Sequence, residues 1–158
     1  MEKILYRQMR RGIMSNQINV TRKEFSESFR EHYLLYRYIV NSSISPKSRR
    51  LLLFYSVECG LKALIMKTYA INTYEGLKKH SEDYGKRVHG HDLKAMTKEV
   101  GIAEQFPLKK IHLSQGGRVL PDRYNELWRY GASVVDSREE EDEEKVLQRI
   151  AEWIEKRI

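Results

Sequence analysis

The feature that most constrains this chain is a long, predominantly apolar segment without proline at residues 48–70, SRRLLLFYSVECGLKALIMKTYA. Drawn as a helix, the segment carries apolar residues on nearly every side, which is typical of a helix that other helices surround. Gly60 lies near its middle, and a glycine there lets a neighbouring helix approach closely. Ser45 as N-cap and Pro46 at the first helical position predict where this central helix begins.

Other stretches of the chain also show helical signals. Between residues 22 and 40, apolar and aromatic residues recur at helical spacing, and Thr21 followed by Glu24 predicts a capping box at the start. A shorter helix is expected from about Asp92, ending at Gly101, a residue type that often follows a helix C-terminus. With no strong alternating strand pattern, the expected fold class is all-α.

The remaining segments carry weaker local signals. Residues 71–92 are polar and read as a long connection with at most one helical turn. Another short helix is expected after Pro107, ending at residues 116–117, with GGRVL locally extended. Asp122 is placed to cap a helix carrying RYNELWRYGAS.

The last helix is preceded and begun by an acidic run, DSREEEDEE, from Asp136 to Glu144. Ser137 and Glu140 predict a capping box, and an amphipathic stripe follows over residues 146–158. Carboxylates in the first turns of a helix are favoured by the positive end of its dipole. We therefore interpret the run as a solvated helix start rather than as a ligand site.

The net charge of +7 understates how basic the rest of the chain is. The acidic run holds seven of the 22 acidic residues and one of the 29 basic ones, which leaves 28 basic against 15 acidic residues elsewhere. Such an excess favours partners that carry phosphates, above all nucleic acid.

Length and composition favour a single cytoplasmic domain. The 158 residues suffice for one core, and the single cysteine, Cys59, excludes an internal disulfide framework and points to a reducing compartment. We find no apolar run of signal-peptide or membrane-spanning length. Residues 1–20 are expected to form a basic N-terminal arm, and residues 21–158 the helical domain.

No catalytic motif of high specificity is present in the sequence. SQGG lacks the Gly-Lys-Ser/Thr of a phosphate-binding loop, and neither a Gly-x-Ser-x-Gly elbow nor a His-Glu-x-x-His zinc helix occurs. His89 and His91 form the one close histidine pair, with no third metal ligand at a defined spacing. We therefore expect neither a metal nor a cofactor.

Three segments taken together resemble a known family. They are YSVECGLKALIMK with Glu58 and Lys62, GHDLKAM at the start of the shorter helix, and an Arg-Tyr segment before the last helix. This series is similar to HEPN domains, small helical domains of prokaryotic nucleotide-associated, toxin and defence proteins. The resemblance covers about residues 45–135. It implies an up-and-down bundle of four to five main helices, a homodimer, and a nucleotidyltransferase-like or other defence protein as partner.

One branch of this family consists of metal-independent ribonucleases, which the resemblance makes one alternative. Their motif is an arginine followed after four to six residues by a histidine, in a cleft between two copies. In this chain only three residues separate Arg87 from His91, and no histidine follows Arg123 or Arg129. A divergent ribonuclease would therefore use Arg87, His89 or His91, since imidazole titrates near neutrality.

A second branch reads Tyr, a few residues, then Arg-Tyr, and is expected to bind RNA or a nucleotide phosphate. The resemblance assigns this role to Tyr124, Arg129 and Tyr130, and the nearby Arg123 adds a second positive charge. Glu58, in the middle of the most apolar helix, needs a partner if it is buried. We expect Arg129 to be that partner, with Lys62 as the local alternative.

A third alternative is an interaction scaffold that binds no small ligand. The N-terminal arm would then pack on another chain through its apolar residues, which are Ile4, Leu5, Met9 and Ile13.

Overall fold

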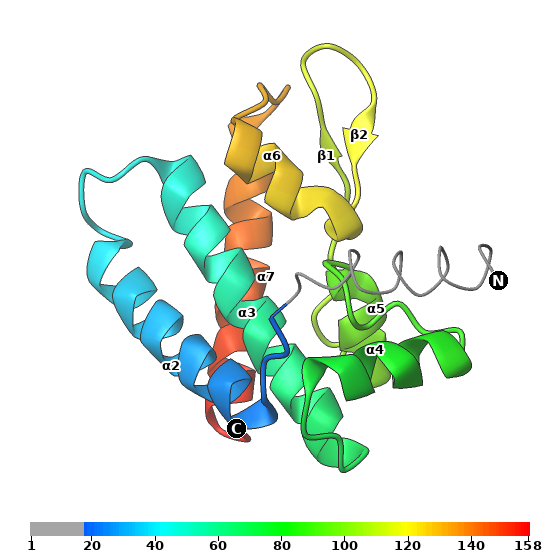
Figure 1. The fold of residues 1–158 in the computed structure, drawn as a ribbon. Coiled ribbons are helices and arrows are strands. Elements are labelled where there is room, and N and C mark those ends of the chain that lie inside the picture. Colours follow the sequence, from blue (N-terminus) through cyan, green and yellow to red (C-terminus); the bar gives the residue numbers. More distant parts are fainter. Residues whose placement is uncertain (1–17) are drawn as a thin grey trace, which may run out of the picture.

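The structure is a computed structural model that describes residues 18–158. Within this range six α-helices pack on one another, with one short hairpin at the edge (Figure 1), so the predicted all-α class is confirmed. None of the described helices combines the length and apolar composition that crossing a membrane requires. The elements in chain order are α2 (Arg22–Ile39), α3 (Pro46–Thr68), α4 (Tyr74–Asp83), α5 (Leu93–Glu99), β1 (Ile111–His112), β2 (Arg118–Val119), the 3-10 helix η1 (Pro121–Arg123), α6 (Tyr124–Tyr130) and α7 (Ser137–Glu155).

The predicted central helix is α3, which contacts α2, α5, α6 and α7 (Figure 1). Gly60 marks the closest approach of its neighbours: a Cβ atom there would lie 2.7 Å from Ile154 of α7 and 2.9 Å from Phe29 of α2. A side chain at this position would force both helices outward. The fully buried side chains of α3 include Leu53, Phe54, Val57, Leu61 and Met66.

Several predicted helix boundaries are confirmed, and two of them, at Thr21 and Asp92, by a side-chain capping contact. Thr21 and Glu24 form the capping box of α2, and Ser45 and Pro46 stand at the start of α3. At α5 the Asp92 side chain accepts a hydrogen bond from the Ala95 backbone amide. Just past the end of this helix, Gly101 takes a φ of +79°, which costs glycine little.

Two of the weaker predictions were wrong. The presumed connection 71–92 contains the ten-residue helix α4, capped by Thr73, whose only fully buried apolar anchor is Leu77. With so few buried positions the helix leaves almost no period in the sequence. The segment after Pro107 forms strand β1 of the hairpin instead of a helix, because positive φ angles at residues 116–117 turn the chain back on itself.

The two caps predicted for the last helices also need correction. Asp122 lies inside the 3-10 helix η1, and α6 begins after Arg123 without a side-chain cap. Asp136, one residue before the predicted Ser137, is the N-cap of α7 and accepts a hydrogen bond from the backbone amide of Arg138. Glu140 is therefore free to reach into the interior.

The interpretation of the acidic run as a solvated helix start was wrong for three of its carboxylates, which are buried. Glu144 accepts hydrogen bonds from Arg49 Nε and Arg50 Nε, each at 2.8 Å, and from the Tyr36 hydroxyl. Glu140 accepts from Arg50 at 3.3 Å and from the indole of Trp128 at 3.1 Å. The third buried carboxylate is Glu143, which is not part of these ion pairs. The pairs of Arg49 and Arg50 with Glu140 and Glu144 form an ion cluster that joins the start of α3 to the first turns of α7.

The prediction for the N-terminal arm falls largely outside the described residues, and so do Ile4, Leu5, Met9 and Ile13. Near the start of the described range, the chain pairs with the segment that begins α4. The Val20 carbonyl accepts a hydrogen bond from the Tyr74 amide, and Thr21 forms a bridge with Thr73.

Candidate functional site

Three polar side chains predicted from the sequence meet beside the middle of α3. Glu58 is buried, and its Oε1 accepts a hydrogen bond of 2.6 Å from Lys62 Nζ, one helical turn later. His91, in the loop before α5, places Nδ1 at 3.1 Å from both oxygens of the same carboxylate. One carboxylate thus holds a buried ammonium group and a half-exposed imidazole against α3.

The pKa of Glu58 reflects a balance between burial and these two partners. Burial raises the pKa, while the hydrogen bond from His91 and the positive charge of Lys62 lower it. The two partners prevail, so the net pKa lies below its usual value and the carboxylate is ionised at neutral pH. A buried charge stabilised in this way depends on both partners.

The expected contact between Glu58 and Arg129 is wrong, and the local alternative Lys62 is the partner that the structure contains. The Arg129 guanidinium instead donates a hydrogen bond to the hydroxyl of Tyr55, one turn before Glu58 on α3. Arg129 stands near the exposed end of α6, so it meets the exposed part of α3 rather than its buried carboxylate. Helical spacing places Tyr55 and Glu58 on neighbouring parts of one face.

Arg129 lies between two aromatic rings at the surface. Its guanidinium carbon is 5.8 Å from the ring centroid of Tyr55 and 6.0 Å from that of Tyr130. Tyr130 is 74% exposed, which leaves a face of its ring open to solvent. Beside it, Lys47 Nζ donates a 2.7 Å hydrogen bond to the Gly131 carbonyl, which brings a second positive charge to the end of α6.

The other two ligand-binding residues predicted on this segment behave differently. Tyr124 is completely buried, and its hydroxyl donates to the Lys109 carbonyl, so it cannot contact a ligand at the surface. Burial also raises the pKa of its phenol above the ordinary value. Arg123, the last residue of η1, is exposed, but Glu126 of α6 holds its guanidinium at 2.7 Å. The adjacent Trp128 is buried in the core.

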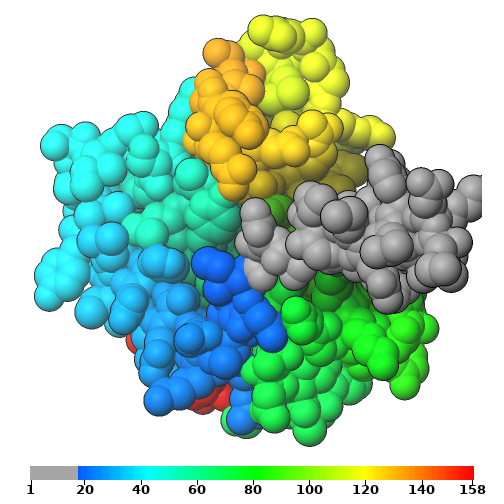
Figure 2. All heavy atoms as spheres, in the orientation of Figure 1, coloured from blue at the N-terminus to red at the C-terminus, as the bar shows by residue number. Residues whose placement is uncertain are grey.

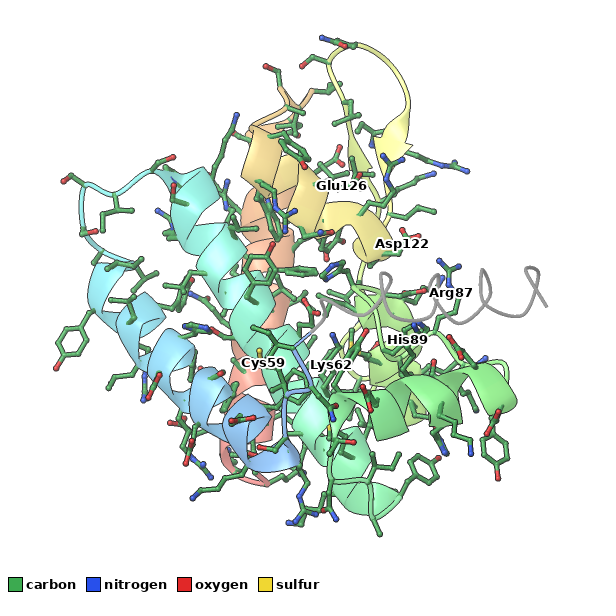
Figure 3. The ribbon with its side chains drawn as sticks, viewed as in Figure 1. Cys59, Lys62, Arg87, His89, Asp122 and Glu126 are labelled. Atoms are coloured by element: carbon green, nitrogen blue, oxygen red, sulfur yellow. The ribbon has the colours of Figure 1, made fainter. Side chains whose placement is uncertain are left out.

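A pocket of about 250 Å³ opens beside the Glu58 cluster. Figure 3 shows Arg87 and His89 in the loop before α5, Asp122 on η1 above them, and Lys62 on α3. Arg87 lies between two carboxylates, with Asp92 at 3.5 Å and Asp122 at 3.7 Å. The lining residues are Arg87, His89, Gly90, His91, Asp92 and Asp122.

Both histidines of the pocket are oriented through Nδ1. His89 Nδ1 lies 2.8 Å from the hydroxyl of Ser81 on α4, as His91 Nδ1 lies against Glu58. For the other ring nitrogen, Nε2, of either histidine, we find no hydrogen bond with another residue of the described range. Burial lowers the pKa of His89 below its ordinary value, so this imidazole is neutral and able to accept a proton at neutral pH.

The sequence analysis missed two residues that complete these clusters. Tyr55 positions Arg129, and its place three residues before Glu58 on α3 was a usable signal. Ser81 orients His89, yet it lies in α4, which the sequence analysis did not recognise as a helix. Nothing in the local sequence relates Ser81 to a histidine eight residues later.

A prediction follows from the charge balance at Glu58. Because the folded-state pKa is lowered, the ionised carboxylate stabilises the fold above the ordinary glutamate pKa of 4.5, and this contribution is lost as the pH falls through the lower folded pKa. Glu58→Gln should therefore cost about 2–4 kcal/mol at neutral pH and much less near pH 3.

Urea unfolding followed by circular dichroism at both pH values measures this effect. Glu27→Gln is the matched control, because Glu27 forms an exposed i,i+4 pair with Lys23 at 3.8 Å and should change stability little at either pH. A cost for Glu58→Gln that is equal at both pH values would rule out the charge-based explanation.

Comparison of the chain with protein-family models, with curated proteins and with solved structures finds no match.

Proposed function

We propose that this chain is a HEPN-like helical module that binds RNA or a nucleotide through phosphate groups, in a prokaryotic defence or toxin–antitoxin setting. The observation that carries the proposal is the state of Arg129, an exposed guanidinium held between two tyrosine rings. No described carboxylate forms an ion pair with it, so its remaining N–H donors are open to a phosphate.

The surroundings of Arg129 suit a nucleotide better than a free phosphate ion. The exposed ring of Tyr130 offers a face on which a base can stack. Lys47, at the same end of α6, adds a second cation for the backbone of a strand. A cation beside an open aromatic face is the combination that proteins use to bind single strands with little sequence preference.

The second cluster lies further along the same face of α3. Tyr55, Glu58 and Lys62 are spaced three and four residues apart, so they follow one side of the helix over about 10 Å. The ring of Phe54 connects the clusters, 5.6 Å from Tyr55 and 6.5 Å from His91. Because Phe54, Glu58 and Lys62 are buried, these contacts connect the Arg129 surface to the pocket beside Arg87 through the interior of the protein.

The proposal includes a homodimer in the cytoplasm and a nucleotidyltransferase-like or other defence protein as partner. The outer side of α2 supports self-association, because Leu34 and Leu35 are each 50% exposed and Tyr38 is 78% exposed. Leu35→Glu, placed on this side, should shift the protein from dimer to monomer in sedimentation velocity experiments. A wild-type protein that sediments as a monomer at its highest soluble concentration would contradict the dimer.

Binding of labelled single-stranded RNA tests the main proposal by fluorescence anisotropy at several salt concentrations. Affinity should fall as salt rises, and Arg129→Ala should weaken binding about tenfold while reducing the logarithmic salt slope by about 0.7. Arg129→Lys keeps the charge and should restore the slope without the full affinity.

Arg157→Ala is the matched control for this experiment. Arg157 is also an exposed arginine packed on an aromatic ring, 4.1 Å from the centroid of Trp153, but it lies at the end of the chain beyond α7. If Arg129→Ala and Arg157→Ala lose RNA affinity equally, the loss would reflect the change in net charge and not a specific role of Arg129. Absent or salt-independent RNA binding would remove the proposal.

A ribonuclease is the second candidate function, favoured by the two oriented histidines of the pocket. In such a reaction His89 Nε2 removes the proton of a ribose 2'-hydroxyl, whose oxygen attacks the adjacent phosphorus. The bond from phosphorus to the 5'-oxygen breaks, and His91 gives this leaving oxygen a proton. Arg87 would stabilise the charge that develops on the phosphate oxygens. The products are a cyclic phosphate and a free 5'-hydroxyl.

Incubation of the protein with labelled RNA in the presence of a chelator separates the two candidates. Cleavage that falls at least about 100-fold in both His89→Ala and His91→Ala would identify the enzyme. Intact RNA with wild-type protein under conditions where binding is saturated would exclude the ribonuclease and leave the binding module. Cleavage retained in both variants would indicate a contaminating nuclease.

A further inference from the structure

A second and larger cavity lies between the segment that leads into β1 and the first half of α7. Its volume is about 620 Å³, within the range of pockets that bind small molecules. It shares no lining residue with the pocket beside Glu58 and does not include Arg129. The lining residues are Pro107, Lys109, Lys110, His112, Glu139, Asp142, Glu143, Val146 and Arg149.

The cations of this cavity are largely unpaired. Lys109, Lys110 and Arg149 form no ion pair with any residue of the described range. The carboxylate of Glu139 contacts the imidazole of His112, whose Nδ1 lies 3.0 Å from Glu139 Oε1. An anionic group that enters the cavity would therefore meet three positive charges beside three carboxylates, those of Glu139, Asp142 and Glu143.

Glu143 is the unusual residue of the cavity. It is only 3% exposed, and its Oε2 atom is buried with no hydrogen-bond donor among the described residues. The neighbouring Tyr124 hydroxyl contacts the Lys109 carbonyl and also lies within hydrogen-bonding reach of the Glu143 carboxylate. Burial raises the pKa of Glu143, and this rise is opposed by the Lys109 backbone amide, the Tyr124 hydroxyl and the positive charge of Lys109.

A buried acceptor without a donor destabilises a protein, and such groups are rare in folded chains. A ligand would therefore bind favourably if it donated a hydrogen bond to Glu143 and placed an anionic group near Lys109 and Lys110. Pro107 and Val146 provide apolar walls between these polar groups. A nucleoside monophosphate has this distribution, with a phosphate, donor hydroxyl and amino groups, and an apolar base face.

We infer that the cavity between the β1 segment and α7 binds a nucleoside monophosphate, with its phosphate at Lys109, Lys110 and Arg149 and a donor group of the nucleoside at Glu143. This site is independent of the proposed RNA surface, since the two share no residue. It would allow a mononucleotide to bind while an RNA strand occupies the α3 face.

Isothermal titration calorimetry with AMP, GMP, CMP and UMP tests the inference on the full chain. At least one of them should bind with a Kd below about 1 mM, and the matching nucleoside without phosphate should bind at least about tenfold more weakly. Lys110→Ala, a change at an exposed side chain that should fold normally, should weaken binding about tenfold.

Glu143→Met separates a ligand role from a structural one. If Glu143 serves a ligand, this variant should lose binding about tenfold or more and yet melt no lower than the wild type, because it removes a buried oxygen without a donor. If the carboxylate serves the fold, the melting temperature of the free protein should fall and the inference is overturned.

Arg129→Ala is the control that distinguishes the two sites. It should leave mononucleotide affinity within about twofold of the wild type, whereas Lys110→Ala should leave RNA affinity similarly unchanged. Mononucleotide binding that is lost in Arg129→Ala but kept in Lys110→Ala would belong to the α3 face and overturn the inference. Absence of binding by all four nucleotides would overturn it as well, whatever the result with RNA.

Discussion

The packing of α7 on α3 depends on the neutralisation of buried arginine. Arg50 extends from the start of α3 into the interior, where an unpaired guanidinium would be strongly destabilising. Glu140 and Glu144 of α7 compensate it, and Glu144 also pairs with Arg49. The pairs fix the rotation of α7, so that its apolar stripe faces Gly60 and the core. The pairs also affect how much of the net charge lies at the surface. Two acidic residues of the run that was expected to be solvated neutralise arginines inside the protein instead. The surface is therefore less basic than the count outside the run suggests.

A second buried charge that needs oppositely charged partners lies at the middle of α3, and there its partners connect the fold to the candidate site. Glu58 needs cations, and it takes one from its own helix and one from the loop before α5. Through His91 the carboxylate fixes this loop against α3, which orders the pocket that Arg87 and His89 line. Figure 2 shows α3 in cyan, α4 in green and α6 in yellow to orange on this side of the molecule. A residue that stabilises the core thus also determines the geometry of a surface pocket.

The features that could be predicted from the sequence are those that local chemistry determines. The apolar circumference of α3 and the capping box at Thr21 involve residues close in the chain, and both are present in the structure. The choice among distant partners leaves no such local trace. Helical spacing places Glu58 and Tyr55 on one face of α3. It does not determine that Arg129 contacts the tyrosine and that His91 contacts the carboxylate. For the same reason the acidic run looked solvated, since burial of Glu140 and Glu144 is decided by arginines about 90 residues earlier.

Helix α7 offers an internal comparison that bears on its larger cavity. Its three buried carboxylates occupy neighbouring positions of one helix and differ in how they are satisfied. Glu140 and Glu144 accept hydrogen bonds from arginines, an indole and a phenol, whereas Glu143 keeps an oxygen without a donor. Packing alone would be served better by an apolar side chain at that position, because an unsatisfied buried acceptor costs about 1–3 kcal/mol. Its two neighbours show that the fold can supply partners to buried acids on this helix. The contrast therefore supports the proposed ligand, which would bring a donor to the remaining oxygen of Glu143.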